Sequence, residues 1–547
     1  MREFGIKKKQ DSQGNTSSVP DRARRRHAGR KKLKRPDGRL QTILEILPFL
    51  PLLIAVGVVP LIVFLKVTPV PPDYQQFWVT SYVFDFFSYY KAQITITCAG
   101  LVMAATLGLY LLGLLPRKKS TLYIPLAVYA VMLVASTIAS KHPLIALGGF
   151  FDRAEGMWVL LAYVVLLVGT YLFVSDAVHA WRILAVWAAA LCVISVLGLF
   201  QFFGLDFFRS LFGRLLILPA QYRQIAPVLD FNFPRYFIYA TLYNPNNVAS
   251  LMALAFPLAA ACFVLARSRK RQVVFGILAG LLYLTLLGSN GRVGWVAALL
   301  ALLLFAVLSM RRGIVGWWKR LGILALVVVV EFGSLNYFSG GALGIRVGGL
   351  LAATSKTLES GTSQSAVDET RSHPDTLANG GPVSETQEGL AEQLIRKYGT
   401  VVSGRGYIWI RSLQMADDTI LLGRGPDTFA LYFPNQDPYK AFYSLPQAFI
   451  DKPHNMYLQL WLNLGGVATL AFLAMVIMHA VRTPRILKQA DPASDLYMLA
   501  LGLFVGWFAY LLAAFFYDSA VSVAPAFWIV FGLSMALNDA LDAKSSR

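Results

Sequence analysis

The chain of 547 residues is 56% hydrophobic and only 15% charged, and its mean hydropathy is +0.55. A protein surrounded by water needs a far more polar surface than this composition can supply, which excludes a soluble globular protein. We therefore expect an all-α polytopic membrane protein, with Trp and Tyr enriched in the interfacial belts.

The formal net charge of +20 would suit a nucleic-acid partner, but much of the excess lies in the first 41 residues. This segment has almost no apolar side chains and is predicted to be a disordered basic cytoplasmic tail. We expect it to contact anionic lipid headgroups, so the expected partner is the bilayer and no nucleic acid; an RNA- or protein-binding tail is the alternative. The apolar run that follows lacks the cleavage site of a secretory signal.

About twelve runs of roughly 17 to 25 apolar residues follow, the length that a bilayer core of about 30 Å requires of a spanning helix. They lie near residues 42–65, 92–115, 121–139, 156–174, 183–203, 246–266, 273–288, 293–309, 321–338, 456–480, 497–516 and 523–538. The sequence thus predicts transmembrane helices 1–9 within 42–338, a long loop over 339–455, helices 10–12 within 456–538 and a tail over 539–547. The three cysteines lie inside apolar runs and indicate neither a metal cluster nor a disulfide framework.

Loop charges predict the orientation of these helices. Nearly every second loop is short and basic, among them "PRKKS", "RSRKRQ", "RRGIVGWWKR" and "VRTPRILK". The positive-inside rule places these loops and both termini in the cytoplasm, and the loop over 339–455 outside. Within that loop, residues 352–389 are polar and are predicted to be flexible, whereas 394–455 regain aromatic residues and should be folded and carry the site.

The start of the folded half, "LIRKYGTVVSGRGYIWIRSLQMADD", indicates one amphipathic helix. Tyr407, Ile410, Leu413 and Gln414 are spaced around its turns. Glycine and proline turns between aromatic patches follow, up to a histidine at the start of the next apolar run.

Arginines are unusually frequent in the predicted outer loops. Arg292 lies in "GSNGR" at the tip between two spans, where it either reaches lipid headgroups or meets a ligand across a turn of small residues. Arg235 precedes "YNPNN", and the folded half of the long loop holds Arg405, Arg411 and Arg424. Each alone is as readily structural, but a guanidinium binds phosphate bidentately and never deprotonates, so the set suits a diphosphate at the membrane surface.

Two polar segments lie where predicted spans begin. Asn244, Asn246 and Asn247 open the span near 246, where they either cap a helix or bind sugar hydroxyls or phosphate. His454 directly precedes the run at 456–480 and is either an interfacial anchor or a general base, and Asn455 either caps the helix or orients the imidazole. The positive charge of the surrounding arginines is expected to lower the pKa of His454 and to keep its imidazole neutral.

Four segments in this order resemble the O-antigen ligase and polymerase family, the membrane glycosyltransferases of bacterial surface polysaccharides. They are "NPNN" opening a span, "SNGR" before another span, "GRGYIWIRSLQMADDTILLGRGPDTF" in the long outer loop and "HNMYLQLWLNLGG" opening the next span. They lie within roughly residues 240–480, and the last two in tandem are the most specific. The family's "SRG" tip reads "NGR" here, and Asn463 stands where an acidic residue is frequent.

The resemblance implies an inverting enzyme that uses neither metal nor other cofactor, in the bacterial cytoplasmic membrane. It would transfer a glycan from undecaprenyl diphosphate to an acceptor hydroxyl on a glycolipid core, a wall polymer or a protein, at the outer face. Carried over by position, Arg292 and Arg405 would hold the diphosphate and His454 would be catalytic. Further candidates are Arg411 and Arg424 for the diphosphate, and Arg235, Asn246, Asn247 and Asn455 for the donor or its sugars.

Two other functions stay open at this point. A polymerase of the same family would join lipid-linked repeat units to one another instead of to a different acceptor. A polysaccharide flippase or transporter would place ionisable residues near the midplane of broken helices and often shows internal repeats, whereas the polar residues here gather at the predicted outer surface.

Overall fold

The computed structural model describes residues 46–77, 80–116, 118–231, 233–310, 316–348, 389–402, 404–437, 439–440 and 449–545. All described helices and strands lie in the compact unit from Leu47 to Arg547. The predicted basic tail, 1–41, and the predicted flexible stretch, 352–389 without its last residue, lie outside the described residues.

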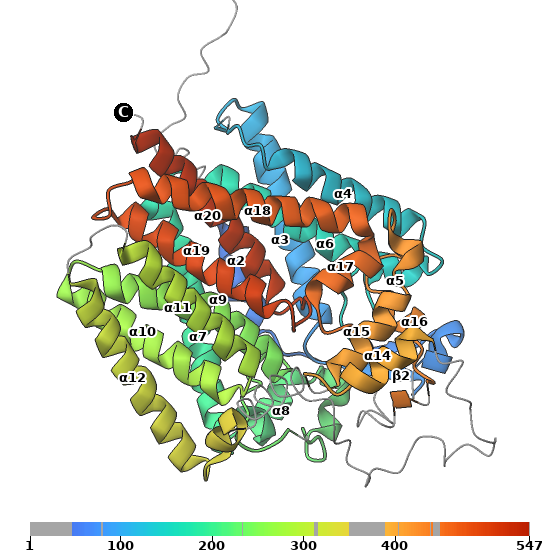
Figure 1. The fold of residues 1–547 in the computed structure, drawn as a ribbon. Helices are drawn as coiled ribbons and strands as arrows, with labels where there is room; N and C mark the ends of the chain where they lie inside the picture. Colours follow the sequence, from blue (N-terminus) through green and yellow to red (C-terminus); the bar gives the residue numbers. More distant parts are fainter. Residues whose placement is uncertain are drawn as a thin grey trace, which may run out of the picture. The chain divides into compact units, whose positions relative to one another are not determined.

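Long apolar helices dominate the described part of the chain, as an all-α polytopic membrane protein requires (Figure 1). Nine are long and apolar enough to cross a bilayer: α3 (Tyr89–Leu111), α7 (Ala177–Phe202), α9 (Pro245–Leu265), α10 (Arg269–Gly288), α11 (Arg292–Met310), α12 (Trp317–Phe338), α18 (Gly466–Gln489), α19 (Asp495–Ala513) and α20 (Ala524–Ser545). Shorter apolar helices are α2 (Leu50–Gly57) with its flanking turns, α4 (Tyr123–Ile138) and α6 (Met157–Phe173).

Every predicted apolar run overlaps one of these helices, but the helices in the runs near 42–65, 121–139 and 156–174 are the three shorter ones, and the run near 456–480 is divided. It forms α17 (Met456–Leu464) and α18, and the chain turns at Gly465, whose φ is +97°. A methyl group at Gly465 would overlap the carbonyl oxygen of Leu421, and one at Gly423 would overlap the backbone of Asn463. The glycines in "LGG" and "LGRG" therefore allow the loop over 420–425 to lie against this turn.

The helices α9, α19 and α20 form the centre of the bundle. In each of them, 89% of the most apolar 18-residue stretch is buried. The helix α9 packs against α10, α11 and α19, and α20 packs against α6 and α19. The sequence of α9 is rich in alanine, and a methyl group at Gly506 of α19 would overlap the carbonyl oxygen of Leu254. Small residues let helix backbones approach closely where lipid provides no hydrophobic force between helices.

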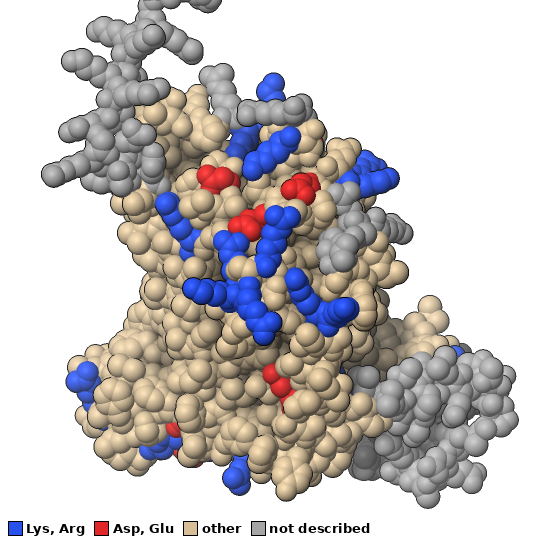
Figure 2. All heavy atoms as spheres, turned by 90° about the vertical axis from the view of Figure 1, so that its left-hand side faces the viewer, with Lys and Arg blue, Asp and Glu red and all other residues tan. Residues whose placement is uncertain are grey.

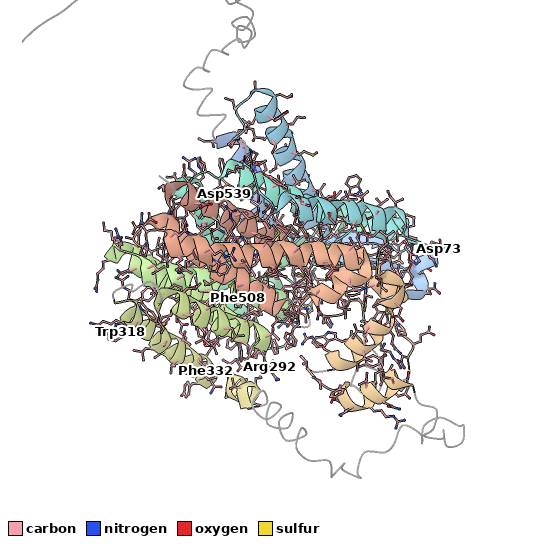
Figure 3. All side chains as sticks on the ribbon, turned by 45° about the horizontal axis from the view of Figure 1, so that its top comes forward. Asp73, Arg292, Trp318, Phe332, Phe508 and Asp539 are labelled. Carbon is pink, nitrogen blue, oxygen red and sulfur yellow. The ribbon has the colours of Figure 1, made fainter. Side chains whose placement is uncertain are left out.

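One end of the bundle is strongly basic. Figure 2 shows Lys and Arg gathered on the face that forms the left-hand side of Figure 1. Helices begin or end there with the exposed residues Arg267, Arg269, Lys270, Arg271, Lys319, Arg485 and Lys488. In Figure 3, Trp318, at the start of α12, lies toward this end, and Asp73 lies at the opposite one.

The folded half of the long loop contains two helices where one was predicted. They are α14 (Leu390–Tyr398) and α15 (Arg405–Gln414), and α16 (Phe429–Tyr432) follows. The break falls at "GTVVSG", because Gly404 has a φ of +84° and a methyl group at Gly406 would overlap the Tyr398 carbonyl oxygen. Leu413 is 58% exposed, whereas Tyr407 is buried with Ile395 and Phe429.

The remaining elements are short. They are the strands β1 (Lys66–Pro69) and β2 (Tyr82–Asp85), which pair antiparallel, the helices α5 (Pro143–Gly148) and α8 (Leu211–Ile217), and the 3-10 turns at Leu47–Phe49, Val59–Leu61, Pro72–Phe77, Phe207–Arg209, Ala220–Ile225 and Asp417–Thr419.

Candidate functional site

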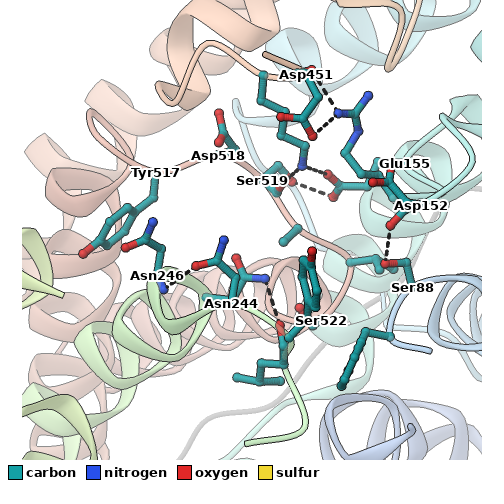
Figure 4. A pocket seen from close by; sticks show the side chains of 18 of the residues that line it. Ser88, Asp152, Glu155, Asn244, Asn246, Asp451, Tyr517, Asp518, Ser519 and Ser522 are labelled. Carbon is teal, nitrogen blue, oxygen red and sulfur yellow. Dashed lines mark hydrogen bonds and ion pairs between the residues drawn. The ribbon is translucent and has the colours of Figure 1, made fainter. Parts of the chain in front are cut away.

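A cavity of about 780 Å³ lies at the end of the bundle opposite the basic face. It is bounded by the start of α9, the loop between α5 and α6, the segment 449–454 before α17, and the loop between α19 and α20. The other end of α19 is fixed at the basic face, where Asp495 pairs with Arg271 at 2.8 Å. Figure 4 shows polar side chains from these separate elements converging on one space.

His454 lies on the wall of this cavity, and its Nδ1 is 2.7 Å from Oδ2 of Asp518. The φ of His454 is +52°, a conformation that is uncommon for a residue other than glycine. The segment before it is held by Trp409, whose Nε1 donates to the Pro453 carbonyl at 2.9 Å. The side chain is 37% exposed, and Nε2 has no hydrogen-bond partner among the described residues.

The carboxylate of Asp518 controls the protonation of His454. Burial alone would lower the pKa of His454, but the charge of Asp518 and its hydrogen bond outweigh burial and the repulsion of Arg405. The pKa therefore lies above its ordinary value of 6.5. The expectation of a lowered pKa was wrong, because it counted the nearby arginines and missed the carboxylate.

Asp518 and its neighbour Tyr517 were not predicted as site residues. Both line the cavity from the loop between α19 and α20, and the pKa of Asp518 is lowered, since the charge of His454 and its hydrogen bond outweigh burial. The Tyr517 hydroxyl accepts a hydrogen bond from the Gly294 amide at 3.3 Å. The signal in the sequence was "FFYDSA", an acid directly after an apolar run at the predicted outer surface.

Arg405 lies close to Tyr517 and Asp518. It is the first residue of α15 and is half-buried, and among the described residues its Nε has no hydrogen-bond partner. Burial lowers the pKa of Arg405, although Tyr517 and Asp518 attract its charge. A guanidinium held beside the cavity with unused donor capacity suits an anionic ligand.

Arg292 begins α11, the helix whose Gly294 amide bonds to Tyr517. It is partly buried and close enough to Arg346 for its charge to help lower the Arg346 pKa, after the larger effect of burial. The start of α11 is thus linked to the cavity through Tyr517, although Arg292 does not itself line the cavity wall.

The other predicted arginines lie away from the cavity. Arg411 pairs with Glu392 at 2.9 Å and with Asp437 at 2.7 Å, which holds α14 and α15 together. Arg424 pairs with Asp418 at 2.8 Å, and Arg235 is exposed with its guanidinium over the Tyr236 ring. These contacts suit structural roles.

The predicted asparagines have divided roles. Asn244 caps α9, since its Oδ1 accepts from the Asn246 amide at 2.9 Å, and Asn455 caps α17 by accepting from the Tyr457 and Leu458 amides. Asn244, Asn246 and Asn247 also line the cavity, and the Asn247 side chain donates to the Leu242 carbonyl. The start of α9, with its partial positive charge, therefore faces the cavity.

A network of buried charges forms the wall nearest α6. Arg153 is 7% exposed and bonds to both Asp427 and Asp451, and Lys452 Nζ lies 3.5 Å from Oε2 of Glu155. The other carboxylate oxygen of Glu155 accepts from Ser519 at 2.8 Å and from Tyr163 at 3.0 Å. This network joins the segment before His454 to two other loops, and the sequence analysis did not identify it.

The described residues contain no group of three or more His, Cys, Asp and Glu side chains that could hold a metal ion. An imidazole–carboxylate pair and the start of a helix line one cavity, and the guanidinium of Arg405 interacts with Asp518 from beside it. Such a site can take a proton from a hydroxyl and stabilise an anion beside it.

No curated protein matches the chain. Residues 254–473 match the family model described as O-antigen ligase, a range that includes Arg292, Arg405 and His454. Over this segment, the chain is similar to the O-antigen ligases of surface polysaccharide biosynthesis.

Proposed function

We propose that this protein transfers a glycan from undecaprenyl diphosphate to an acceptor hydroxyl at the outer face of the bacterial cytoplasmic membrane. The observation that carries the proposal is the 2.7 Å contact between His454 Nδ1 and Asp518 Oδ2 on the wall of the cavity. Its support is the family match together with a cavity at the end opposite the basic face, the end that the positive-inside rule assigns to the outside.

In the proposed reaction, His454 acts as the general base. With its Nδ1–H donated to Asp518, the neutral imidazole presents the Nε2 lone pair, which takes the proton of the acceptor hydroxyl. The hydroxyl oxygen forms a bond to the anomeric carbon of the donor, and the bond from that carbon to the diphosphate oxygen breaks. Asp518 stabilises the imidazolium that results, and displacement at one carbon inverts its configuration.

The leaving diphosphate takes the electron pair and gains negative charge. Arg405, close enough to interact with Asp518 and Tyr517, would stabilise that charge in a site partly shielded from water. Arg292, at the first turn of α11, is the second candidate for this role, because a helix start and a guanidinium both favour an anion.

The proposal can be tested with the full chain in lipid nanodiscs, a native lipid-linked glycan and a candidate acceptor. Transfer should give one capped acceptor and free undecaprenyl diphosphate, with the new linkage inverted. A ladder of lengthening lipid-linked glycan without acceptor would identify a polymerase instead. Movement of intact lipid-linked glycan across the membrane without any new glycosidic bond would contradict both and indicate a flippase.

A further inference from the structure

Asp152 lines the cavity on the side opposite Tyr517, as Figure 4 shows, and the proposed proton transfer does not use it. Its side chain accepts no hydrogen bond from any described residue, and its Oδ1 is fully buried. Burial raises the pKa of Asp152 to about 6, because desolvation outweighs the attraction of Arg153. At neutral pH this carboxyl is therefore mostly ionised and lacks hydrogen-bond donors from the described protein.

Two neighbours on the same wall also have unused hydrogen-bonding capacity. Arg153 is 7% exposed, and its Nη2 has no partner among the described residues. Glu155 is 2% exposed, and its Oε2 accepts no hydrogen bond, although Lys452 lies 3.5 Å away. Native proteins satisfy nearly all buried polar groups, so this wall calls for a ligand that both donates and accepts. A hydroxyl does both, and a ligand with several hydroxyls would lie beside all three side chains in the cavity.

An aromatic ring completes this side of the cavity. Tyr243 lines the cavity and is 57% exposed, and its ring lies 5.4 Å from that of Phe87. Its φ is +69°, which is unfavourable for a bulky residue. An exposed ring face beside carboxylates suits a pyranose, whose ring has an apolar face and a hydroxylated edge.

The loop between α19 and α20 shows where this wall lies relative to His454. Tyr517 contacts the start of α11, Asp518 contacts His454, and Ser519 contacts Glu155. The three consecutive residues therefore run from the proposed diphosphate end, past the base, to the Asp152 wall (Figure 4). A hydroxyl that displaces a diphosphate approaches from the side away from the leaving group, which here is the side of Asp152.

From these contacts we infer that Asp152, Arg153, Glu155 and Tyr243 form the binding site for the acceptor, and that the acceptor is a neutral, polyhydroxylated sugar. The inference rests on the proposed function, because the role of His454 defines the acceptor side. The lining on this side carries three carboxylates, Asp152, Glu155 and Asp451, against the two cations Arg153 and Lys452, and the buried carboxylate of Asp427 lies against Arg153. The net negative charge of this lining disfavours acceptors that carry phosphate or carboxylate groups.

Binding to the full chain in nanodiscs tests the inference, with saturation-transfer NMR as the readout. The probes are the methyl glycosides of glucose, galactose and mannose, glucose 6-phosphate, and farnesyl diphosphate as a short diphosphate lipid. At least one neutral glycoside should bind, and glucose 6-phosphate should bind more weakly. Asp152→Asn and Tyr243→Ala should each weaken glycoside binding by about tenfold, while the exposed carboxylate variant Asp73→Asn should not.

Farnesyl diphosphate separates this inference from the proposed function. Asp152→Asn and Tyr243→Ala should bind it as the parent does, which also shows that both variants are folded. If it binds but no glycoside does, or if both variants bind glycosides like the parent, the acceptor site is refuted while the donor site stands. If glycosides bind as expected but farnesyl diphosphate does not, the acceptor site stands and the proposed donor is wrong.

Discussion

His454 Nδ1 and Asp518 Oδ2 lie 2.7 Å apart, which joins the segment before α17 to the loop between α19 and α20, 64 positions further along the chain. The contact orients the imidazole, because Asp518 accepts the Nδ1 hydrogen and leaves Nε2 for the cavity. The contact also raises the pKa of His454, since the same carboxylate favours the imidazolium. One interaction thus determines both the direction in which the base acts and the pH range in which it is neutral.

Replacing Asp518 with Asn should shift the pH dependence of transfer. The base acts in its neutral form, so activity rises with pH through the His454 pKa, and in the parent that midpoint should lie above 6.5. In Asp518→Asn, burial and the repulsion of Arg405 would outweigh the weaker attraction of Asp451, so the midpoint should fall below 6.5 while the maximal rate also falls. A pH–rate profile of both proteins measures this, and an unchanged midpoint would contradict the assigned pair.

Substitutions at Arg405 and Arg411, which lie on the same helix, can be compared directly. Arg405→Lys should impair transfer and Arg405→Ala should lower it by about 10² or more, because a point charge cannot reproduce a guanidinium fork. Arg411→Ala should instead lower stability by about 1 to 3 kcal/mol through the lost bonds to Glu392 and Asp437, with the rate per folded molecule retained. Transfer rates normalised to folded protein distinguish the two, and full transfer by Arg405→Ala would refute its role.

Gly465 should tolerate no side chain. Gly465→Ala places alanine at a φ of +97° and against the Leu421 carbonyl, so unfolding should become easier by about 2 kcal/mol or more. Gly322→Ala is the control, since that glycine is an exposed residue within α12 with open space where a methyl group would lie. The unfolding temperatures of both variants in nanodiscs test this, and a Gly465→Ala protein as stable as the Gly322→Ala protein would contradict the described turn.

Orientation in the membrane is tested by reporter fusions. A reporter near Gly380, in the loop between α12 and α14, should be active only in the extracytoplasmic compartment, and one near Lys270 only in the cytoplasm. Cytoplasmic activity at Gly380 would place the cavity on the wrong side for a donor carried at the outer face.

The helices and part of the site were predictable from the sequence because both rest on local signals. Apolar length located the nine described helices that are long enough to span a membrane, and an arginine or histidine near a predicted outer helix end pointed to Arg405 and His454. The partner of His454 was not predictable, because Asp518 reaches it only through the packing of α17 against the bundle. The same holds for Arg153, whose partners Asp427 and Asp451 lie hundreds of positions away.

Helix geometry could have separated two arginines that the sequence analysis grouped. Arg405 and Arg411 are six positions apart, and neighbours on one helix face are three or four apart, so the two point in different directions. The structure places Arg405 toward Asp518 and Arg411 toward Glu392 and Asp437. The division of the predicted amphipathic helix at Gly404 depended on a close backbone contact that periodicity does not reveal.

The most direct test of the account is the rate of glycan transfer by His454→Ala in the native membrane, with His142→Ala as a control. His142 is a second half-buried histidine near the same end of the bundle, but it contacts Tyr74 and does not line the cavity. The account predicts that His454→Ala inserts normally, still binds lipid-linked donor and transfers about 10² to 10⁴ times more slowly, while His142→Ala keeps the parental rate. Transfer by His454→Ala at the parental rate would contradict the central claim.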